Sequence, residues 1–398
     1  MTTTLLILKI LFWISLFIVF YSYIGYGILL WILVQIKRIF KTKGSGLDKS
    51  YPLPPVALVV AAYNEEDYIR DKIKNSLDLD YPSNLLEIIF VTDGSTDNTG
   101  SIIKEYPQIK HLHESARKGK SAAMNRSIPF IQSSIIVFCD ANTMLNRDCI
   151  KEIVKHYSDP RVGGVAGEKK ILQQGINTAA ATGEGLYWKY ESFLKRLDSE
   201  LFSAVGAAGE LFSIRKELFV PAPEGTIIED FVQSLTVCTK GYVLRYEQNA
   251  YAAEAPSASI KDEMKRKVRI CACAFQAMGL LKELFNPFKH PILSFQFISH
   301  RVLRWTICPL ALLILLISNC MLVLNSDEIF FRLVLMLQLI FYILAATGWV
   351  LANKEIKVKL LYIPFYFLFM NYAVVLGFRR YLQNQQSVLW EKANRQKL

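Results

Sequence analysis

The two ends of the chain carry long apolar runs, whereas the middle alternates between short apolar segments and polar residues. Near the N-terminus, residues 10–36 contain no charged side chain. As a helix this run would be about 40 Å long, more than the ~30 Å hydrocarbon core of a bilayer. Because no small-residue cleavage site follows it, the pattern predicts a membrane anchor rather than a cleaved signal peptide.

Basic residues follow the anchor directly: Lys37, Arg38, Lys41 and Lys43. Cytoplasmic flanks of membrane helices are enriched in lysine and arginine. We therefore expect the anchor to start outside the cell and to end in the cytoplasm.

Three more apolar stretches lie near the C-terminus, at residues 306–324, 333–352 and 360–378, and each is long enough to span a bilayer. The loop at 325–328 is acidic, which suits the outside, and the loop at 353–359 carries three lysines, which suits the inside. A third full crossing would place the basic C-terminal tail outside, against the positive-inside rule. Pro364 and Asn371 are compatible with a re-entrant or interfacial segment, so both arrangements stay open.

The middle of the chain shows the pattern of an α/β domain. Apolar runs at residues 56–60, 88–91 and 135–139 predict strands, and a further short strand is expected around 109–113. Helical segments follow the first three strands in the chain. Alternation of strands and helices predicts a doubly wound sheet with right-handed crossovers.

Polar side chains gather where these strands end. Asn64 and Glu65 follow the first strand, Asp93 ends the second, and Asp140 and Asn142 follow the strand at 135–139. Open α/β sheets bind ligands beyond the carboxyl ends of their strands. Asp140 and Asn142 are two residues apart, so both side-chain oxygens can turn toward one cation. This edge is a candidate metal and diphosphate site.

Composition narrows the class of protein further. Of 398 residues, 52% are hydrophobic, and the net charge is +11. We assign the basic surplus to membrane flanks and an anionic ligand, because no nucleic-acid-binding motif accompanies it. The seven cysteines show no CxxC pattern, so we expect them to occupy core positions rather than a zinc site. The segment KGKS at 118–121 is not a P-loop, because Glu114 stands where that motif needs glycine, and no GxGxxG follows the first strand.

Seven motifs resemble the family 2 of inverting, nucleotide-sugar-dependent glycosyltransferases, which have the GT-A fold. In chain order they are VVAAYNEEDYI at 59–69, VTDGSTDNT at 91–99, KGKSAAMN at 118–125, DANT at 140–143, GAAGELFSIRKELF at 206–219, IIEDF at 227–231 and KRKVRI at 265–270. SHRVLRW at 299–305 and LWEKANR at 389–395 are similar to members that make bacterial exopolysaccharides or cell-surface glycans. The resemblance covers the whole α/β domain.

The resemblance implies a role for each matching residue. Asp140 and Asn142 would hold Mg²⁺ or Mn²⁺ against the diphosphate of the donor. Asp230 would be the general base, with Glu229 in support. The remaining donor-binding positions implied are Ala62, Tyr63, Glu65, Asp93, Lys118, Asp140, Arg266 and Arg269.

Departures from the family pattern bear on the product. Asn142 replaces a second acid, which predicts weaker metal binding. Processive members carry Gln-x-x-Arg-Trp, and here Arg266 and Ile270 replace the glutamine and the tryptophan. This favours addition of single sugars over processive synthesis. The basic run at 265–269 suits either a diphosphate or lipid headgroups.

We therefore predict a GT-A glycosyltransferase of the hexosyltransferase type with one N-terminal and about three C-terminal membrane helices. The predicted parts are an anchor at 1–40, the GT-A domain at 51–285, an interfacial amphipathic segment at 286–305, transmembrane helices at 306–380 and a basic tail at 381–398. The domain would face the cytoplasm of a bacterial inner membrane. It would move a sugar from a nucleotide donor, expected to be UDP-linked, to a lipid-linked or glycan acceptor. The alternatives are a processive polysaccharide synthase and a non-catalytic nucleotide-sugar-binding membrane protein.

Overall fold

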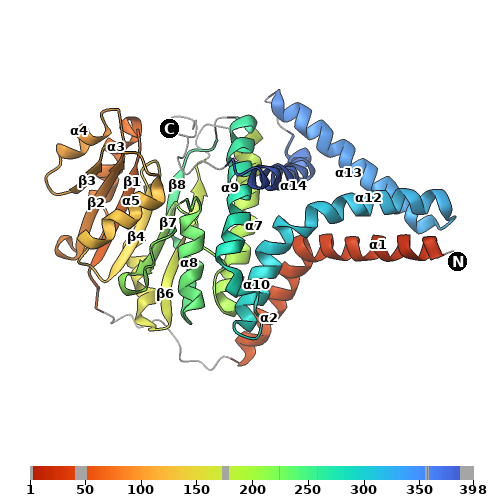
Figure 1. Ribbon diagram of the computed structural model, residues 1–398, viewed down its shortest axis with the longest axis horizontal. Coiled ribbons are helices and arrows are strands. Elements are labelled where there is room, and N and C mark those ends of the chain that lie inside the picture. Colours follow the sequence, from red (N-terminus) through yellow and green to blue (C-terminus); the bar gives the residue numbers. More distant parts are fainter. Residues whose placement is uncertain are drawn as a thin grey trace.

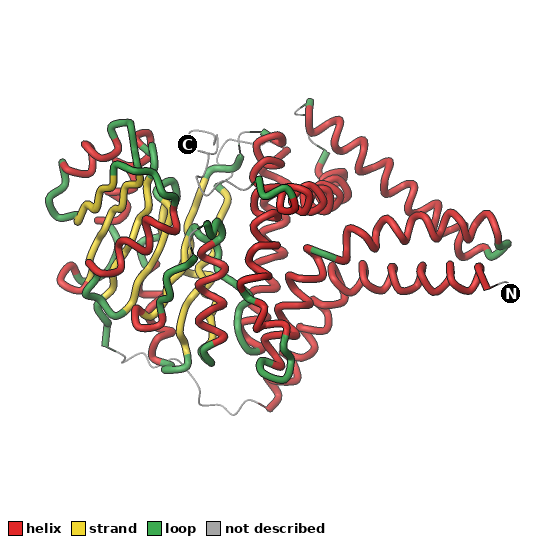
Figure 2. The backbone as a smooth tube through the Cα atoms, viewed as in Figure 1, coloured by secondary structure: helices red, strands yellow, loops and turns green. Residues whose placement is uncertain are grey.

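The computed structural model places all strands at one end of the molecule and the long apolar helices at the other (Figure 1, Figure 2). It describes residues 3–40, 52–172, 179–223, 225–257, 259–354, 356 and 358–385. Lys41, Lys43 and the motif at 389–395 lie outside the described residues.

One eight-stranded mixed sheet forms the centre of the α/β domain, with the strand order β3-β2-β1-β4-β7-β6-β8-β5. The strands are β1 Val56–Ala62, β2 Leu86–Asp93, β3 Lys110–Glu114, β4 Ile135–Asp140, β5 Met144–Leu145, β6 Val162–Ile171, β7 Leu211–Arg215 and β8 Val243–Glu254. The first four are parallel neighbours, as the alternation of strands and helices predicted. Beyond β4, strand β7 is antiparallel to both β4 and β6, whereas β6 and β8 are parallel. The predicted α/β class with the GT-A arrangement is confirmed.

Strand β4 occupies the middle of the sheet, between β1 and β7. Its apolar residues 135–139 are all buried, which explains the unbroken run of isoleucine, valine, phenylalanine and cysteine. Asp140 pairs in register with Ala61 of β1. The first acid after the buried run therefore lies at the carboxyl edge of the parallel strands.

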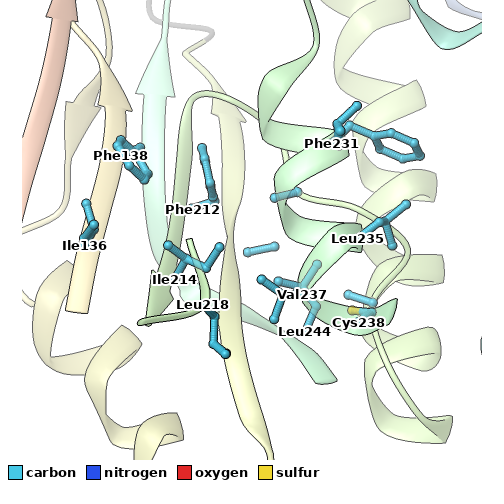
Figure 3. Close-up of a cluster of buried hydrophobic side chains, with 14 of the residues drawn as sticks. Ile136, Phe138, Phe212, Ile214, Leu218, Phe231, Leu235, Val237, Cys238 and Leu244 are labelled. Atoms are coloured by element: carbon cyan, nitrogen blue, oxygen red, sulfur yellow. The ribbon is translucent and has the colours of Figure 1, made fainter. Parts of the chain in front are cut away.

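Helices cover both faces of this sheet. They are α3 Glu66–Leu77, α4 Thr99–Lys104, α5 Lys120–Ser127, α6 Cys149–Val154, α7 Ala179–Leu201, α8 Glu229–Thr239 and α9 Ile260–Leu280. Figure 3 shows α8 beside the sheet, and its residues Phe231 and Leu235 belong to the same buried apolar cluster as Phe212 and Ile214 of β7. The ring of Phe231 packs against Phe297 and Trp305. The start of α8 is thus held between the sheet and the segment at 291–305.

The remaining helices belong to the apolar ends of the chain. They are α1 Thr3–Phe20, α2 Tyr26–Phe40, α10 Pro291–Phe297, α11 Leu303–Trp305, α12 Ile307–Asn325, α13 Ile329–Asn353 and α14 Lys359–Leu382. Two π-helical turns, Tyr21–Gly25 and Ile298–Val302, join α1 to α2 and α10 to α11. Among the described residues, four segments are long and apolar enough to cross a membrane: Thr3–Phe40, Ile307–Asn325, Ile329–Asn353 and Leu360–Leu382.

Buried charges on α7 attach the membrane-side helices to the sheet domain. Asp198 binds His300 at 2.6 Å and accepts a hydrogen bond from Tyr26 at 2.5 Å. Glu191, about two turns earlier on the same face of α7, accepts hydrogen bonds from Arg301 and Arg304 at 2.7 Å each. The segment at 286–305 was predicted to be amphipathic and interfacial, and its position at a membrane surface stays a prediction. Its side chains His300, Arg301 and Arg304 bind acids of α7.

Helix α14 differs from the other apolar helices. Half of the residues in its most apolar stretch are buried within the protein, compared with 11% of those in α13. It packs along α9 of the sheet domain and lies across the direction of α1 and α12 (Figure 1). Helix α14 is therefore in contact with both the sheet domain and the other apolar helices.

The close approach of α14 to α9 depends on Gly377. A Cβ atom there would lie 2.6 Å from Cys271 Cβ and 2.8 Å from the backbone nitrogen of Ala272. We expect Gly377→Ala to destabilise the protein by about 1–3 kcal/mol, because the helices must separate. A lower midpoint of thermal unfolding in detergent would show this. Gly279→Ala in α9 is the matched control: open space surrounds that position, so the midpoint should stay the same or rise.

Candidate active site

A cavity of about 310 Å³ opens at the carboxyl ends of β1 and β4, between the sheet and helices α7, α8 and α9. We call it the sheet-edge cavity. The structure brings together in its wall seven of the residues predicted from the sequence. They are Glu65, Asp140, Asn142, Glu229, Asp230, Arg266 and Arg269.

Lys120, the first residue of α5, holds the acidic side of this cavity together. Its Nζ lies 2.6 Å from Asp140 Oδ1, 3.4 Å from Glu229 Oε1 and 3.4 Å from the carbonyl oxygen of Gly209. Burial alone would lower the pKa of Lys120, but Asp140, Glu229 and Asp230 outweigh burial and hold that pKa above its ordinary value. The ammonium group of Lys120 thus lies among the carboxyl groups of Asp140, Glu229 and Asp230.

The two acids that begin α8 have raised pKa values. Burial raises the pKa of Glu229, and Lys120 offsets this only in part. Burial, with the neighbouring charge of Glu229, raises the pKa of Asp230 to about 7. A carboxyl group with a pKa near neutrality can accept and release a proton under physiological conditions. This is the property required of a general base.

The loop at 206–210 packs directly against this acidic pair. Gly206 has a φ of +86°, and a Cβ atom there would lie 2.2 Å from the ring of Phe231. A Cβ atom on Gly209 would lie 2.8 Å from Lys120 Nζ and 3.4 Å from Asp230 Oδ2. The glycines of the GAAGE motif therefore give the loop the conformation and the space that the cavity needs.

Two arginines of α9 face the same cavity in different electrostatic states. Arg266 pairs with Glu263 at 3.1 Å and with Glu254 at 3.5 Å. Arg269 forms no hydrogen bond or close ion pair with the part of the chain that the structure describes, and burial lowers its pKa. A largely buried guanidinium without a protein anion beside it is suited to an anionic ligand.

Four predicted donor-binding residues lie outside the lining of the sheet-edge cavity: Ala62, Tyr63, Asp93 and Lys118. Asp93 is fully buried and accepts hydrogen bonds from the backbone nitrogens of Lys118 at 3.0 Å and Gly119 at 2.6 Å. Tyr63 packs its ring against the guanidinium of Arg117, 3.7 Å from the ring centroid. These residues shape the loop that leads into α5 and Lys120, and their contact with a nucleotide stays a prediction.

Sequence reasoning missed several charged residues of the cavity. Lys120 lies two positions after the predicted Lys118, whose side chain is exposed to solvent. Lys169 on β6 forms ion pairs with Glu210 and Glu254 beside the cavity. Glu210 could have been found, because it belongs to the GAAGE motif. Nothing in the sequence pointed to Lys169, because its acidic partners are 41 and 85 positions away.

The sheet is mixed, β4 ends in an acid, and α8 begins with an acidic pair. This combination is that of the GT-A nucleotide-sugar transferases. Residues 57–220 match the sequence profile of Glycosyl transferase family 2 and belong to that family of glycosyltransferases.

Similar proteins agree with this assignment. A beta-monoglucosyldiacylglycerol synthase from a Nostoc species is 34% identical over 168 residues, covering 40% of this chain and 34% of the relative. A poly-beta-1,6-N-acetyl-D-glucosamine synthase from Staphylococcus aureus is 26% identical over 247 residues, covering 60% of this chain and 58% of the relative. The chain thus spans between a third and three fifths of the length of these curated relatives.

One solved structure shares the fold over nearly the whole molecule. It is a mannosyltransferase from Pyrobaculum calidifontis in complex with GDP-Man and Mn²⁺. The similarity covers 94% of this chain and 100% of that chain, with a TM-score of 0.68 and 22% sequence identity. The arrangement of sheet domain and apolar helices therefore recurs in an experimental structure.

Proposed function

We propose that the protein is a membrane-bound inverting glycosyltransferase that uses a nucleotide-diphosphate sugar held in the sheet-edge cavity. The observation that carries this proposal is Asp230, whose pKa is raised to about 7 in the same cavity as Asp140 and Arg269. Asp230 removes the proton from the acceptor hydroxyl as its oxygen attacks the anomeric carbon. Glu229 supports Asp230 through its charge.

Asp140 and Asn142 would hold the Mg²⁺ or Mn²⁺ ion. The carboxylate of Asp140 and the amide oxygen of Asn142 are the kind of oxygen ligands that these ions prefer, and both residues line the cavity. Lys120 Nζ, 2.6 Å from Asp140 Oδ1, already pairs with one of these oxygens. Oxygens of the diphosphate would supply further ligands. The ion, when bound, neutralises charge on the leaving nucleoside diphosphate.

The other predicted residues surround this centre. Arg269, with Arg266 beside it, would bind the diphosphate through guanidinium hydrogen bonds. Glu65 lines the cavity at the end of β1, and Ala62, Tyr63 and Asp93 follow on the nucleoside side. Lys118 contributes its backbone nitrogen to Asp93 rather than a cavity-facing side chain. We expect the donor to be UDP-linked, and GDP-linked sugars are the first alternative, given the ligand of the Pyrobaculum calidifontis enzyme.

The membrane arrangement follows from the helices. We propose that α1, α12 and α13 cross a bacterial inner membrane and that α14 lies at its cytoplasmic surface. Lys37 and Arg38 at the end of α2 and Lys354 directly after α13 then face the cytoplasm, as does the sheet domain. The acceptor, a lipid-linked compound or a glycan, would reach Asp230 from the membrane side.

A change at Asn142 tests the metal proposal. We expect Asn142→Asp to lower several-fold the Mn²⁺ concentration that gives half-maximal activity, because a charged ligand replaces a neutral one. A titration of transfer activity with Mn²⁺ measures this. An unchanged midpoint would contradict a role of residue 142 in metal binding.

The experiment that tests the proposed function is a screen of UDP- and GDP-linked sugars with Mg²⁺ or Mn²⁺. Released nucleoside diphosphate is measured with and without membrane extract as the source of acceptor. We expect release from one donor, with stimulation by the extract. Failure with every donor would contradict the proposal and favour a nucleotide-sugar-binding protein without catalysis.

Product length distinguishes single addition from processive synthesis. Ile270 in the wall of the cavity, in place of a tryptophan, supports single addition. A ladder of polymers made by the purified protein from one donor would contradict it.

A further inference from the structure

A second cavity, of about 360 Å³, lies on the membrane side of the sheet-edge cavity. We call it the apolar chamber. Helix α14 forms much of its wall, together with the π-helical turn after α1 and helix α7. Cys271 of α9 and the residues His300, Arg301, Arg304 and Trp305 form the rest. The lining residues that matter here are Tyr23, Tyr190, Ile363, Phe367, Met370 and Val374.

The two cavities share part of their walls. Tyr187 and Glu191 of α7, Cys271 of α9, Arg301, Trp305 and Met370 of α14 line both. A molecule that fills the apolar chamber therefore lies next to the cavity that contains Asp230.

The charged groups of the chamber wall bind one another. Glu191 receives Arg301 and Arg304 at 2.7 Å each, and His300 lies 3.3 Å from it. Arg304 also donates to the carbonyl oxygen of Ser22 at 2.9 Å. Because these charged groups bind one another and the backbone, the surface that faces the chamber is mainly apolar. A glycan chain would lose hydrogen bonds with water on entering such a space, whereas a hydrocarbon chain would not.

Two tyrosine hydroxyls of the wall also form hydrogen bonds inside the protein. Tyr23 donates to Asn371 at 3.0 Å, and Tyr190 donates to the carbonyl oxygen of Tyr23 at 2.5 Å. Their rings are therefore the surfaces that a ligand would meet.

Irregular backbone geometry marks the same place independently. The π-helical turn Tyr21–Gly25 contributes Tyr23 to the chamber, and the turn Ile298–Val302 contributes His300 and Arg301. The turns contact each other through a hydrogen bond of 2.8 Å between Tyr21 Oη and Ser299 Oγ. π-Helical turns in helices occur frequently at functional sites.

We propose that the apolar chamber binds the acyl chain of a lipid acceptor whose hydroxyl group extends into the sheet-edge cavity. This inference rests on the proposed function and names its acceptor class. The lipid hydroxyl oxygen forms a bond to the anomeric carbon while the bond from that carbon to the diphosphate oxygen breaks. The hydroxyl proton passes to Asp230, and the nucleoside diphosphate leaves with the electron pair.

The surface of α14 supplies a route from the bilayer. Leu360 and Val375 are 75% and 51% exposed on its outer face, and Ile363, which lines the chamber, is itself 62% exposed. An acyl chain can thus pass along α14 from lipid into the chamber without crossing a polar surface.

The test uses the full chain in phosphatidylglycerol vesicles that contain a diacylglycerol with a photoreactive diazirine in its acyl chain. After illumination, mass spectrometry locates the labelled residues. We expect saturable labelling of Tyr187, Met370 and Val374, and protection by unlabelled diacylglycerol but not by glycerol. Labelling confined to Leu360 and Val375, or labelling that does not saturate, would overturn the proposal. Protection by an oligosaccharide in place of diacylglycerol would also overturn it and assign the chamber to a glycan.

Two neighbouring valines give a matched pair of variants. Val374→Phe fills the chamber, and we expect it to lower chamber labelling at least fivefold and to raise the KM for diacylglycerol by a similar factor. Val375→Phe, one residue along on the outer face, should change neither quantity. Equal labelling in wild-type protein and Val374→Phe would contradict the proposal.

Release of nucleoside diphosphate without acceptor separates the two proposals. We expect Val375→Phe to release as much nucleoside diphosphate as the wild-type protein, because Val375 lines neither cavity. Chamber labelling in a protein that releases no nucleoside diphosphate from any donor would overturn the proposed function and leave the lipid site supported.

Discussion

Replacing Asp230 by asparagine is expected to lower the rate of sugar transfer by roughly 10²–10⁴-fold, the usual contribution of a general base. The amide keeps the shape of the carboxyl group but cannot accept the acceptor proton. Donor affinity should change little, because Asp140 and Arg269 are unaffected. Transfer measured at saturating donor, together with nucleotide binding by calorimetry, separates the two effects.

Stability provides the control for this variant. Burial and Glu229 raise the pKa of Asp230 from 3.8 to about 7, so the folded state binds this proton more tightly than the unfolded state does. The free energy of unfolding therefore falls as the pH rises through that window. Asp230→Asn removes the buried charge, and its midpoint of unfolding at pH above 7 should equal or exceed that of the wild-type protein. Asp71→Asn, at an exposed acid of α3, should leave activity unchanged. Full activity of Asp230→Asn would contradict the assigned role.

Lys120→Met should weaken both folding and activity, the largest combined effect that we expect. The change leaves Asp140, Glu229 and Asp230 without their shared ammonium ion. Loss of one partner from a buried charge cluster costs about 2–5 kcal/mol. Because the Lys120 side chain is 20% exposed, we expect the lower half of that range. Thermal unfolding should reveal the loss, and activity should fall at least tenfold.

Two further measurements give Lys120→Met a specific signature. Addition of Mn²⁺ should restore part of the lost stability, since another cation then balances the acids. Lys118→Met is the contrast, because its exposed side chain lies outside the cavity lining, and we expect less than a threefold change in activity. Equal effects of the two variants would contradict the placement of Lys120.

The parallel half of the sheet could be predicted because its signals are local. The apolar run before Asp140 identifies β4, and its abrupt end identifies the sheet edge. Strands β6 and β8 carry weaker signals: β6 begins Val-Gly-Gly, and its pairing with β8 includes two register shifts. Their placement depends on contacts between residues about 80 positions apart. Sequence patterns within one segment do not contain that information.

The residues of the candidate site also differ in whether a local sequence pattern identifies them. Asp140, Asn142 and Asp230 stand in motifs with defined spacing, and the structure brings them into one cavity. Lys120 was missed because two lysines lie in the KGK segment, and only the fold distinguishes the inward from the outward side chain. His300, Arg301 and Arg304 belong to the segment at 286–305, which was predicted to be interfacial, and the sequence did not indicate their partners. Glu191 and Asp198 of α7, about 100 positions earlier, hold them inside.

The same contacts connect the membrane helices with the sheet domain. Helix α7 carries Tyr187 and Glu191 in the walls of both cavities and binds α2 through Asp198. A membrane-derived acceptor and a nucleotide donor would thus meet at one helix. This arrangement explains why the apolar helices pack on the sheet domain rather than connecting to it by a loop alone.

The central claim is that Asp230 acts as the base in sugar transfer, and the pH dependence of kcat/KM tests it most directly. Because only the ionised carboxylate accepts a proton, kcat/KM should fall about tenfold for each pH unit below the pKa of about 7 and should level off above it. Asp230→Asn should lose this dependence together with its activity. A wild-type profile that stays flat between about pH 5 and pH 9 would contradict the assignment of Asp230 as the base.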